Sequence, residues 1–466
     1  MAEIEPVSKF IRDPVHDIIR IHDRFVLDLI DTAAMQRLRR VRQLGLAWLV
    51  YPGAEHSRFT HSLGAYHLAG RVMHQLEDEH AHRNNSAVEP LFGDVRRAAV
   101  LAAALLHDVG HGPFSHAFEH TIGHVSKSPV SHETWTRRII DENAEIRQAL
   151  EEAGGEDVVT LVEDILAGVA TPHFMSAIVS SQLDVDRIDY VLRDSHMTGC
   201  RYGRFDLEWM LRTLAVRPVR NSSGNDKQPV ETIVVDGRRG LDGLEAQLVG
   251  RHYMYRHVYF HKAVRAAECV LRSILQRAAT LVADGKPLGV NDAFRKLATG
   301  RADDVSTSEY LSLDDFVILS WIEDWARTDV DGILRDLCHR LIARHLFKAI
   351  IVPPTSECDQ WQYANNREAV QRALEKRNYD PAYYFARDRV QDTAYKDFLY
   401  NFDQGGDPIE SEIWYLDSAS GPPRPLSSFH NSVVIQARNA LHYYGEYWFV
   451  PEDVAGDPDI AEFKWR

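Results

Sequence analysis

The sequence predicts a mainly α-helical protein with a small β-hairpin and an α+β lobe toward its C-terminal end. Apolar residues recur at intervals of three and four along most of the first 285 positions, which is the spacing of one helix face. Runs of β-branched residues are few and short. Hydrophobic residues make up 45% of the 466 positions and charged residues 26%, so the chain has enough apolar material for a large core.

The expected helices follow one another through the first part of the chain. Met35, Leu38 and Val41 recur at helical spacing before Gly45, which suits the end of a helix. Amphipathic stripes predict further helices over 62–79, 95–106, 131–152, 156–168, 173–197 and 241–282.

Strand character is limited to short runs. The run at 231–236 is expected to pair with 214–219 across the Ser/Gly/Asn-rich loop 221–228, which makes the small hairpin. The runs at 348–352 and 431–436 are further candidate strands in the C-terminal part.

Segments rich in glycine, proline and aspartate mark candidate boundaries at 283–289 and 404–425. We therefore expect a helical catalytic domain over residues 1–285. The lobe over 286–466 is a candidate for oligomerisation.

The charge balance and the cysteines restrict the class of protein. Fifty-three basic and 68 acidic residues give a net charge of −15, which argues against non-specific binding to nucleic acid or to an anionic membrane. The four cysteines lie far apart without a CxxC pair, so neither a disulfide framework nor a thiolate zinc site is expected. The first residues lack a signal-peptide pattern, and the longest uncharged apolar run, 98–106, is too short to span a membrane. A reducing cytoplasm is the expected location.

Histidine and aspartate motifs mark the expected site. His107 and Asp108 are adjacent at the end of an apolar run, where an imidazole and a carboxylate can hold one cation. A pair of this kind occurs often by chance, and the alternative is a hydrogen bond at a helix end. His61 upstream and Asp186 downstream bring the donors to four, which leaves positions for water and a substrate oxygen.

These motifs resemble the HD-domain phosphohydrolases. The similar stretches are RFTHSLG at 58–64, HDVGHGPFSH at 107–116 and DVDRIDY at 184–190. They are most similar to the branch of deoxynucleoside triphosphate (dNTP) triphosphohydrolases that includes bacterial dGTPases and the vertebrate enzyme with a sterile-alpha-motif domain. The resemblance runs from about residue 11 to about residue 262 and implies an HD-domain helical core.

The resemblance implies a role for each matching residue. One divalent metal ion, with Mn²⁺ or Mg²⁺ favoured over Fe²⁺ or Zn²⁺, would be held by His61, His107, Asp108 and Asp186. Phosphate contacts and proton transfer are implied for His111, His116 and His132. Substrate contacts are implied for Gln43, Arg58, Arg187, Tyr190, Asp194, Arg251, Tyr255 and Tyr259.

Some positions depart from the family's pattern or have an alternative interpretation. Arg187 stands where relatives often have lysine, and a planar guanidinium grips phosphate differently. Tyr255 replaces a histidine of the vertebrate enzyme, and it forms a stripe with Arg251 and Tyr259 that would also suit a core-facing helix. Asp189 is expected in a salt bridge within its helix and directed away from the face that carries Asp186.

The expected activity is metal-dependent hydrolysis of a dNTP to a deoxynucleoside and inorganic triphosphate. One alternative is a phosphohydrolase acting on nucleoside monophosphates or other phosphate esters, but the joint presence of Arg58, Arg187 and Arg251 favours a triphosphate. A second alternative is a nucleotide-sensing or nucleic-acid-binding protein with a vestigial site, which four intact metal ligands argue against.

A regulatory nucleotide site is a separate expectation. Asp31, Gln36 and Arg39 match the residues with which the vertebrate enzyme reads guanine between subunits, although the same stretch also suits an ordinary amphipathic helix. Arg12 stands where that enzyme has asparagine. The expectation includes GTP or a dNTP as activator, and a homo-oligomer that is a dimer, tetramer or hexamer.

Overall fold

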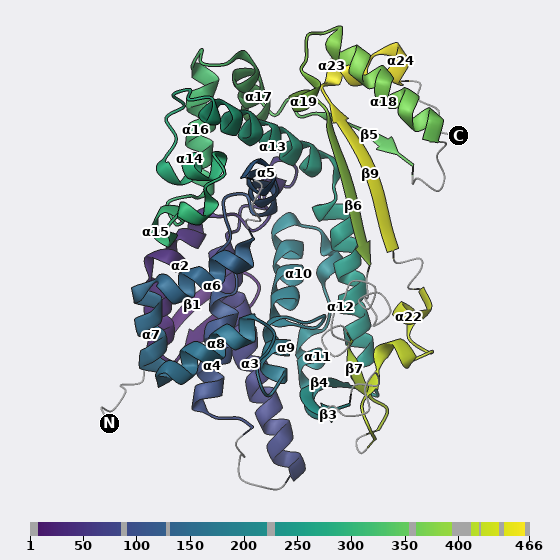
Figure 1. Ribbon diagram of the computed structural model, residues 1–466. Coiled ribbons are helices and arrows are strands. Elements are labelled where there is room, and N and C mark those ends of the chain that lie inside the picture. The colour runs from purple at the N-terminus through teal and green to yellow at the C-terminus, as the bar shows by residue number, and fades with distance from the viewer. Residues whose placement is uncertain are drawn as a thin grey trace.

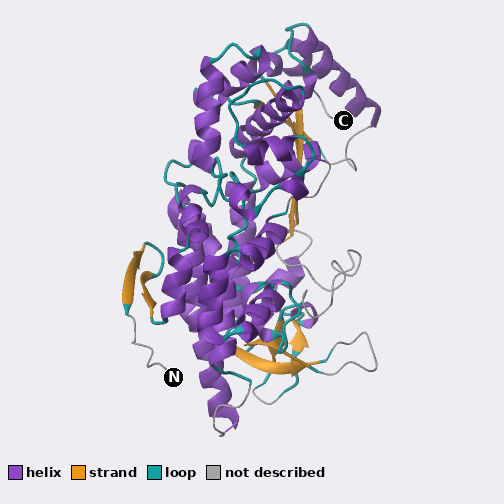
Figure 2. Cartoon of the chain, turned by 60° about the vertical axis from the view of Figure 1, so that its left-hand side comes forward, coloured by secondary structure: helices purple, strands orange, loops and turns teal. Residues whose placement is uncertain are grey.

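The computed structural model describes residues 8–84, 91–126, 131–220, 229–353, 360–393, 412–418, 421–437 and 442–461. Helices form the body of the molecule, and within these residues the strands gather into three small sheets (Figure 1; Figure 2). The mainly α class predicted from the sequence is confirmed.

The centre of the body consists of α3 (Arg58–Asn84), α4 (Asp94–Leu106) and α10 (Val185–Thr198). Helix α3 packs against both of the others, and α4 is buried without interruption from Ala98 to Leu106. A helix that is apolar on all sides belongs inside a core. The helices around this centre are α1 (Arg24–Asp31), α2 (Ala33–Arg37), α5 (His116–Ser126), α6 (His132–Glu142), α7 (Ala144–Gly154), α8 (Glu156–Leu166), α9 (Phe174–Val179), α11 (Leu207–Arg212), α12 (Leu241–Met254) and α13 (Lys262–Ala283).

Most of the helices after α13 surround its far end and the C-terminal sheet, whereas α22 packs against α12 (Figure 1). The helices after α13 are α14 (Asp292–Ala298), α15 (Thr307–Tyr310), α16 (Asp315–Arg327), α17 (Gly332–Ile342), α18 (Gln360–Glu375), α19 (Pro381–Tyr384), α22 (Val433–Ala437), α23 (Glu452–Ala455) and α24 (Pro458–Ala461). Short 3-10 turns occur at Leu38–Arg40, Ala47–Leu49, Arg201–Gly203, Ala302–Asp304 and Leu426–Ser428.

Three of the expected helices are shorter than predicted. The stretch 131–152 divides at Asn143, whose side chain accepts from the backbone N–H of Ile146 (3.1 Å) and starts α7. The stretch 173–197 divides before Asp184, which starts α10 in the same way, and the stretch 241–282 is interrupted by a π-helical turn at Tyr255–Tyr259. Apolar periodicity continues across these breaks, so it could not reveal them.

The predicted hairpin is present. Strand β3 (Leu214–Val219) pairs antiparallel with β4 (Val230–Asp236), while the connecting loop 221–228 lies outside the described residues. Strands β7 (Trp414–Leu416) and β8 (Arg424–Pro425) extend this sheet in the order β3-β4-β7-β8. Part of the boundary expected at 404–425 thus pairs with the hairpin of the first domain, and the division at 285 stays a prediction.

The second sheet contains the predicted strand β5 (Lys348–Val352). It pairs with β9 (His442–Val450), which also pairs with β6 (Ala386–Thr393), and both pairings are antiparallel. The strand expected at 431–436 is wrong, because this stretch forms α22. Ser432 begins that helix by accepting from the backbone N–H of Ile435 (3.1 Å), and this cap outweighs the strand preference of the β-branched residues.

An N-terminal hairpin was not predicted. Strands β1 (Lys9–Asp13) and β2 (Asp17–Ile21) pair on the flank of the helical body (Figure 2). Its turn is closed by Asp13 Oδ1, which accepts from the backbone N–H groups of Val15 and His16, both at 2.9 Å.

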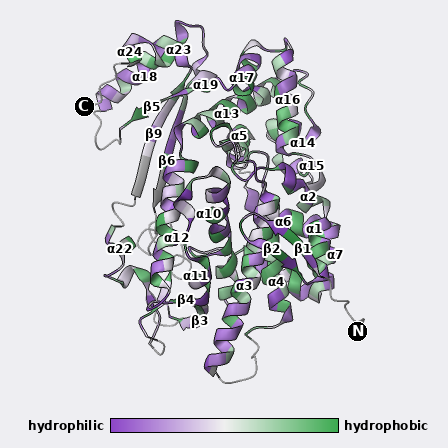
Figure 3. Ribbon diagram, turned by 180° about the vertical axis from the view of Figure 1, so that it is seen from behind, coloured by the Kyte–Doolittle hydropathy of each residue, from purple (hydrophilic) through white to green (hydrophobic). Residues whose placement is uncertain are grey.

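One apolar core joins the two halves of the chain. A single buried cluster includes Leu105 of α4, Phe294 of α14 and Trp448 of β9. Hydrophobic residues concentrate where the elements meet, whereas the last turns of α3 are hydrophilic and extend beyond the body (Figure 3). Among the described helices, none combines the length and apolarity needed to cross a membrane.

Candidate active site

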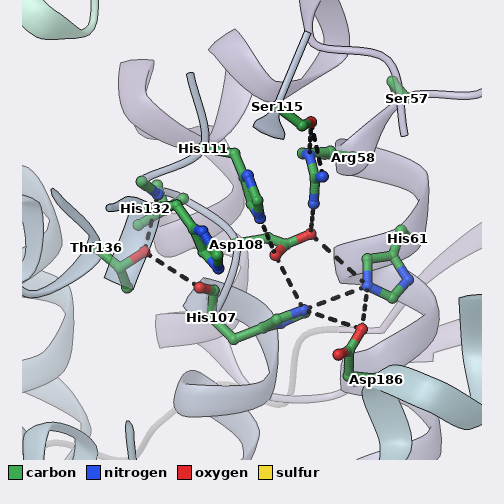
Figure 4. A network of polar contacts seen from close by, with 12 residues as sticks. Ser57, Arg58, His61, His107, Asp108, His111, Ser115, His132, Thr136 and Asp186 are labelled. Carbon is green, nitrogen blue, oxygen red and sulfur yellow. Dashed lines mark hydrogen bonds and ion pairs between the residues drawn. The ribbon is translucent and has the colours of Figure 1, made fainter. Parts of the chain in front are cut away.

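The four predicted metal ligands converge in the middle of the helical body (Figure 4). His61 lies in the first turn of α3, His107 and Asp108 directly follow α4, and Asp186 lies in the first turn of α10. His61 Nε2 is 3.0 Å from Asp186 Oδ1 and 3.3 Å from His107 Nε2. His107 Nε2 is 3.5 Å from Asp108 Oδ1.

The outer nitrogens of both imidazoles are already bonded. His61 Nδ1 lies 2.8 Å from Asp189 Oδ2, and His107 Nδ1 lies 2.9 Å from the carbonyl oxygen of Ala104. These acceptors hold the proton on Nδ1. The lone pair of each Nε2 then faces the centre of the site and can ligate a metal ion, as in protein metal sites. Burial disfavours a charged His61, but Asp186 and Asp189 raise its pKa to about 10, so the surroundings attract positive charge strongly. The donor set therefore fits a divalent metal ion.

Asp189 has more contacts than the sequence indicated. The predicted salt bridge is present, with Arg193 Nε donating to Asp189 Oδ2 at 2.8 Å. The expectation that Asp189 is directed away from the metal face is wrong, since the same carboxylate also bonds His61 and lies 2.6 Å from His16 Nε2. Gly64 permits this approach of α3 to α10, because a Cβ there would overlap Asp189 Oδ1.

A tight loop follows the His107–Asp108 pair. Thr136 of α6 donates through its hydroxyl to the carbonyl of His107 (3.1 Å) and accepts from the backbone N–H of Gly110 (3.0 Å). A Cβ at Gly110 would overlap the backbone of α6 at His132 and Thr136, so only glycine lets the loop lie this close.

Residues beyond 285 hold the same loop from outside. Asp315 Oδ1 accepts from the backbone N–H of Phe114 (2.8 Å), and Asp315 Oδ2 accepts from that of Arg42 (2.9 Å). The Tyr310 hydroxyl donates to the carbonyl of Gly110 (2.9 Å). The fully buried Arg37 of α2 joins the loop to this later part of the chain, because it donates to the carbonyls of His111 and Leu313, both at 2.8 Å.

The three predicted catalytic histidines gather around one carboxylate, Glu119. His116 Nδ1 lies 3.2 Å from Glu119 Oε2, and His132 Nδ1 lies 3.1 Å from Glu119 Oε1. His111 stacks on His132 at 3.8 Å between ring centres, and His111 Nε2 is 3.1 Å from Asp108 Oδ1. Glu119 was missed in the sequence, although its place one turn after His116 on α5 was a usable signal.

Charges in this cluster are strongly perturbed. Burial, with the nearby charge of Arg58, lowers the pKa of His111 to about 3. Burial opposes ionisation of Glu119, yet its hydrogen bonds to His116 and His132 lower its pKa. The pKa of His132 is raised, because Glu119 outweighs the effect of burial.

Two of the predicted phosphate-binding arginines lie beside the predicted metal ligands. Arg58 donates from Nη1 to Asp108 Oδ2 (2.5 Å) and from Nη2 to Ser115 Oγ (2.7 Å). Arg187 is held by Asp184, the residue that caps α10. Arg251 is buried with its guanidinium 5.9 Å from the ring centre of Tyr255.

A cavity of about 530 Å³ opens beside these groups. Two predicted site residues, His61 and Arg251, are buried and do not line this cavity. The predicted residues that line it are Gln43, Arg58, His107, Asp108, His111, His116, His132, Asp186, Arg187, Tyr190, Asp194, Tyr255 and Tyr259.

Asp194 is fixed at the wall of this cavity by two side chains. The Tyr259 hydroxyl donates to Asp194 Oδ2 (2.7 Å), and His56 Nε2 lies 2.7 Å from Asp194 Oδ1. Burial and the Asp194 charge raise the pKa of Tyr259 well above its usual range, so its hydroxyl stays protonated. His56 was not singled out from the sequence.

The predicted regulatory residues lie outside the cavity wall. Arg39 donates to Gln36 Oε1 (2.8 Å) and lies 3.6 Å over the ring of Phe59. Gln36 donates to the carbonyl of Ile30 (2.8 Å), and Asp31 is exposed at the end of α1. Their role as a nucleotide site stays a prediction.

The chain is similar to known proteins over most of its length. The sequence profile of the HD domain matches residues 58–194. The chain is 32% identical to the uncharacterized protein YwfO of Bacillus subtilis, and the alignment covers 97% of this chain and 94% of YwfO. It is 28% identical to the human deoxynucleoside triphosphate triphosphohydrolase SAMHD1, over 73% of this chain and 55% of the human protein. A crystal structure of a phosphohydrolase from Bacteroides thetaiotaomicron superposes with a TM-score of 0.76 at 27% identity, covering 96% of this chain and 100% of the other.

Proposed function

The chain belongs to the HD-domain phosphohydrolases, and we propose that it hydrolyses dNTPs to a deoxynucleoside and inorganic triphosphate in a metal-dependent reaction. The observation that carries the proposal is the convergence on one cavity of a metal donor set, two arginines and a histidine–glutamate cluster. A relative whose name states this activity, SAMHD1, supports the same substrate class.

His61, His107, Asp108 and Asp186 would hold the metal ion. When bound, a divalent ion supplies charge neutralisation at the phosphate and lowers the pKa of a water nucleophile. The chain's own part is to present two imidazole nitrogens whose tautomers are fixed by Asp189 and Ala104.

The phosphate groups would lie between the metal ligands and the histidine cluster. Arg58 and Arg187 line this region, and each can donate to phosphate oxygens after exchanging a carboxylate partner. His116 is 67% exposed at the side chain and is oriented by Glu119, so it can give a proton to the departing 5′-oxygen.

The sugar would lie against the tyrosines. Asp194, held by Tyr259 and His56, can accept from a 3′-hydroxyl, while Tyr190 packs edge-on against Tyr259 at 6.1 Å between ring centres. A ribose would bring an additional hydroxyl into this wall, so we expect deoxyribose to be preferred.

The test is to incubate the protein with each dNTP and with Mn²⁺, Mg²⁺, Fe²⁺ or Zn²⁺ in turn, and to resolve the products by anion-exchange chromatography. Inorganic triphosphate and deoxynucleoside in equal amounts are expected, with Mn²⁺ or Mg²⁺ the most effective. Release of single phosphates, or turnover of monophosphates alone, would replace the proposal with the other phosphate-ester activity.

Two variants provide the controls. His116→Ala should reduce turnover by roughly 10²- to 10⁴-fold, as expected for loss of a general acid. His120→Ala removes an exposed histidine of the same helix that does not line the cavity, and it should leave turnover unchanged.

A further inference from the structure

The substrate cavity has an apolar part that the proposed chemistry does not use. Leu44, Ala47, Val258 and Val264 line it, and Val264 packs in one buried cluster with Ala47. Apolar walls suit a nucleobase better than a phosphate chain.

A charged pair on the first two turns of α13 lines the same cavity. Arg265 donates from Nη1 to Glu268 Oε2 at 2.5 Å. Arg265 is also fixed from behind, because its Nε and Nη2 donate to the two oxygens of Asp388 on β6, both at 2.7 Å. Asp388 is only 5% exposed, so the guanidinium has one orientation.

The local charge gives a phosphate group no net attraction at this place, because Nε, Nη1 and Nη2 of Arg265 all donate to carboxylates. Asp388 and Glu268 together cancel the charges of Arg265 and of Arg272, which donates to Asp388 at 3.3 Å. Glu268 lines the cavity, and its carboxylate would repel a phosphate group. The anionic end of a substrate therefore belongs with Arg58 and Arg187, and a neutral end belongs beside Arg265 and Glu268.

We propose that Arg265 and Glu268 read the edge of the substrate's base and select guanine, an inference that rests on the proposed dNTP hydrolysis. Guanine has two adjacent N–H donors, N1–H and N2–H, that a single carboxylate accepts together, next to an O6 acceptor for a guanidinium. Thymine offers Glu268 one such donor, and adenine and cytosine offer one amino group each. Asp388 acts as a positioning residue, since it touches Arg265 and does not line the cavity.

The experiment compares kcat/KM for the four dNTPs in the wild-type protein and three variants. In wild type, dGTP should exceed each other dNTP by roughly tenfold or more. Glu268→Gln keeps the shape and removes the charge, and should reduce kcat/KM for dGTP by about 10- to 100-fold while the other three change less than about threefold. Asp388→Asn should raise KM for dGTP with little change in kcat.

Arg272→Gln is the matched control. It removes another member of the same network that does not line the cavity, so the preference for dGTP should persist. Equal kcat/KM for the four dNTPs in wild type, or an unchanged ratio in Glu268→Gln, would overturn the inference. If no dNTP is hydrolysed the proposed function fails, and calorimetric binding of the four dNTPs to the same proteins then decides base selection separately.

Discussion

At the scale of single residues, the hydrogen bond at Nδ1 of His61 determines whether Nε2 can act as a metal ligand. His61 bonds Asp189 through Nδ1, and this carboxylate in turn bonds Arg193. The convergence of the four candidate metal ligands could be anticipated because they lie in recognisable motifs. The contacts of Asp189 with His61, of Glu119 with His132 and of His56 with Asp194 could not be predicted, because only the fold brings these partners near.

Protonation of His67 should make stability depend on pH. Burial, followed by the nearby His16 and Arg71, lowers the pKa of His67 from 6.5 to about 4. The stability contribution of neutral His67 is fully present above pH 6.5. It is lost as the pH falls from 6.5 toward 4, because the unfolded chain takes up the proton near pH 6.5 while the folded protein takes it up only near pH 4. The contribution is at most about 3 kcal/mol.

Urea unfolding at a series of pH values checks this. His67→Gln should show a smaller fall in the free energy of unfolding between pH 6.5 and 4. His74→Gln removes a histidine of the same helix that is 72% exposed, and it should keep the wild-type dependence. Identical curves for His67→Gln and wild type would contradict the prediction.

At the scale of elements, the contact between α3 and α10 depends on one missing side chain. A Cβ at Gly64 would overlap Asp189 Oδ1 and come 2.5 Å from Arg193 Nη2, whereas a Cβ at Gly70 meets only Leu101 Cδ2 at 3.6 Å. Gly64→Ala should therefore destabilise by about 1–3 kcal/mol or more. Gly70→Ala should stabilise by about 0.5–1 kcal/mol, because alanine favours a helix interior.

Thermal or urea unfolding of the two variants measures these opposite effects. Gly64→Ala should also weaken metal binding, since displaced Asp189 no longer orients His61. Similar stabilities for both variants would show that the two helices can separate without cost.

Elements were predicted better by type than by extent. Helix α4 has an unbroken apolar run, and its observed bounds differ from the prediction by one residue. Helix caps divide the longer stretches at Asn143 and Asp184, and a single polar residue carries too little local signal against continuing periodicity. The β1–β2 hairpin was missed because its turn depends on one aspartate side chain, Asp13.

At the scale of the whole molecule, the part of the chain after 285 supports the loop that carries the histidine cluster. The Asp315 carboxylate accepts from the backbone N–H groups of Phe114, which lines the cavity, and of Arg42. In Asp315→Asn the amide group would face one of these N–H donors, so one buried bond is lost at a cost of about 1–3 kcal/mol. Turnover should fall by roughly tenfold as the loop loosens.

The control is Asp324→Asn, which changes a carboxylate of the same helix that is 69% exposed. It should leave both the melting temperature and turnover unchanged. If Asp315→Asn also keeps wild-type turnover, the C-terminal part does not position the loop.

The regulatory expectation also belongs to the whole molecule. If Asp31, Gln36 and Arg39 bind a guanine nucleotide between subunits, GTP should raise the mass measured by light scattering and the initial rate with a second dNTP. Asp31→Ala should abolish both effects without changing the basal rate. Unchanged mass and unchanged rate with GTP would leave Gln36 and Arg39 as a structural pair at the end of α2.

The hydrogen bonds around the candidate site also set the order in which its parts can assemble during synthesis. His16 meets Asp189 across 173 positions of sequence, and Phe114 meets Asp315 across 201. A ribosome releases these partners one after another. His16 of the N-terminal hairpin therefore cannot meet Asp189 until α10 is made, and the loop at Phe114 cannot meet Asp315 until α16 is made. If the chain hydrolyses dNTPs as proposed, a nascent copy would gain its complete site only after synthesis has passed residue 315, because Asp315 holds the loop at Phe114.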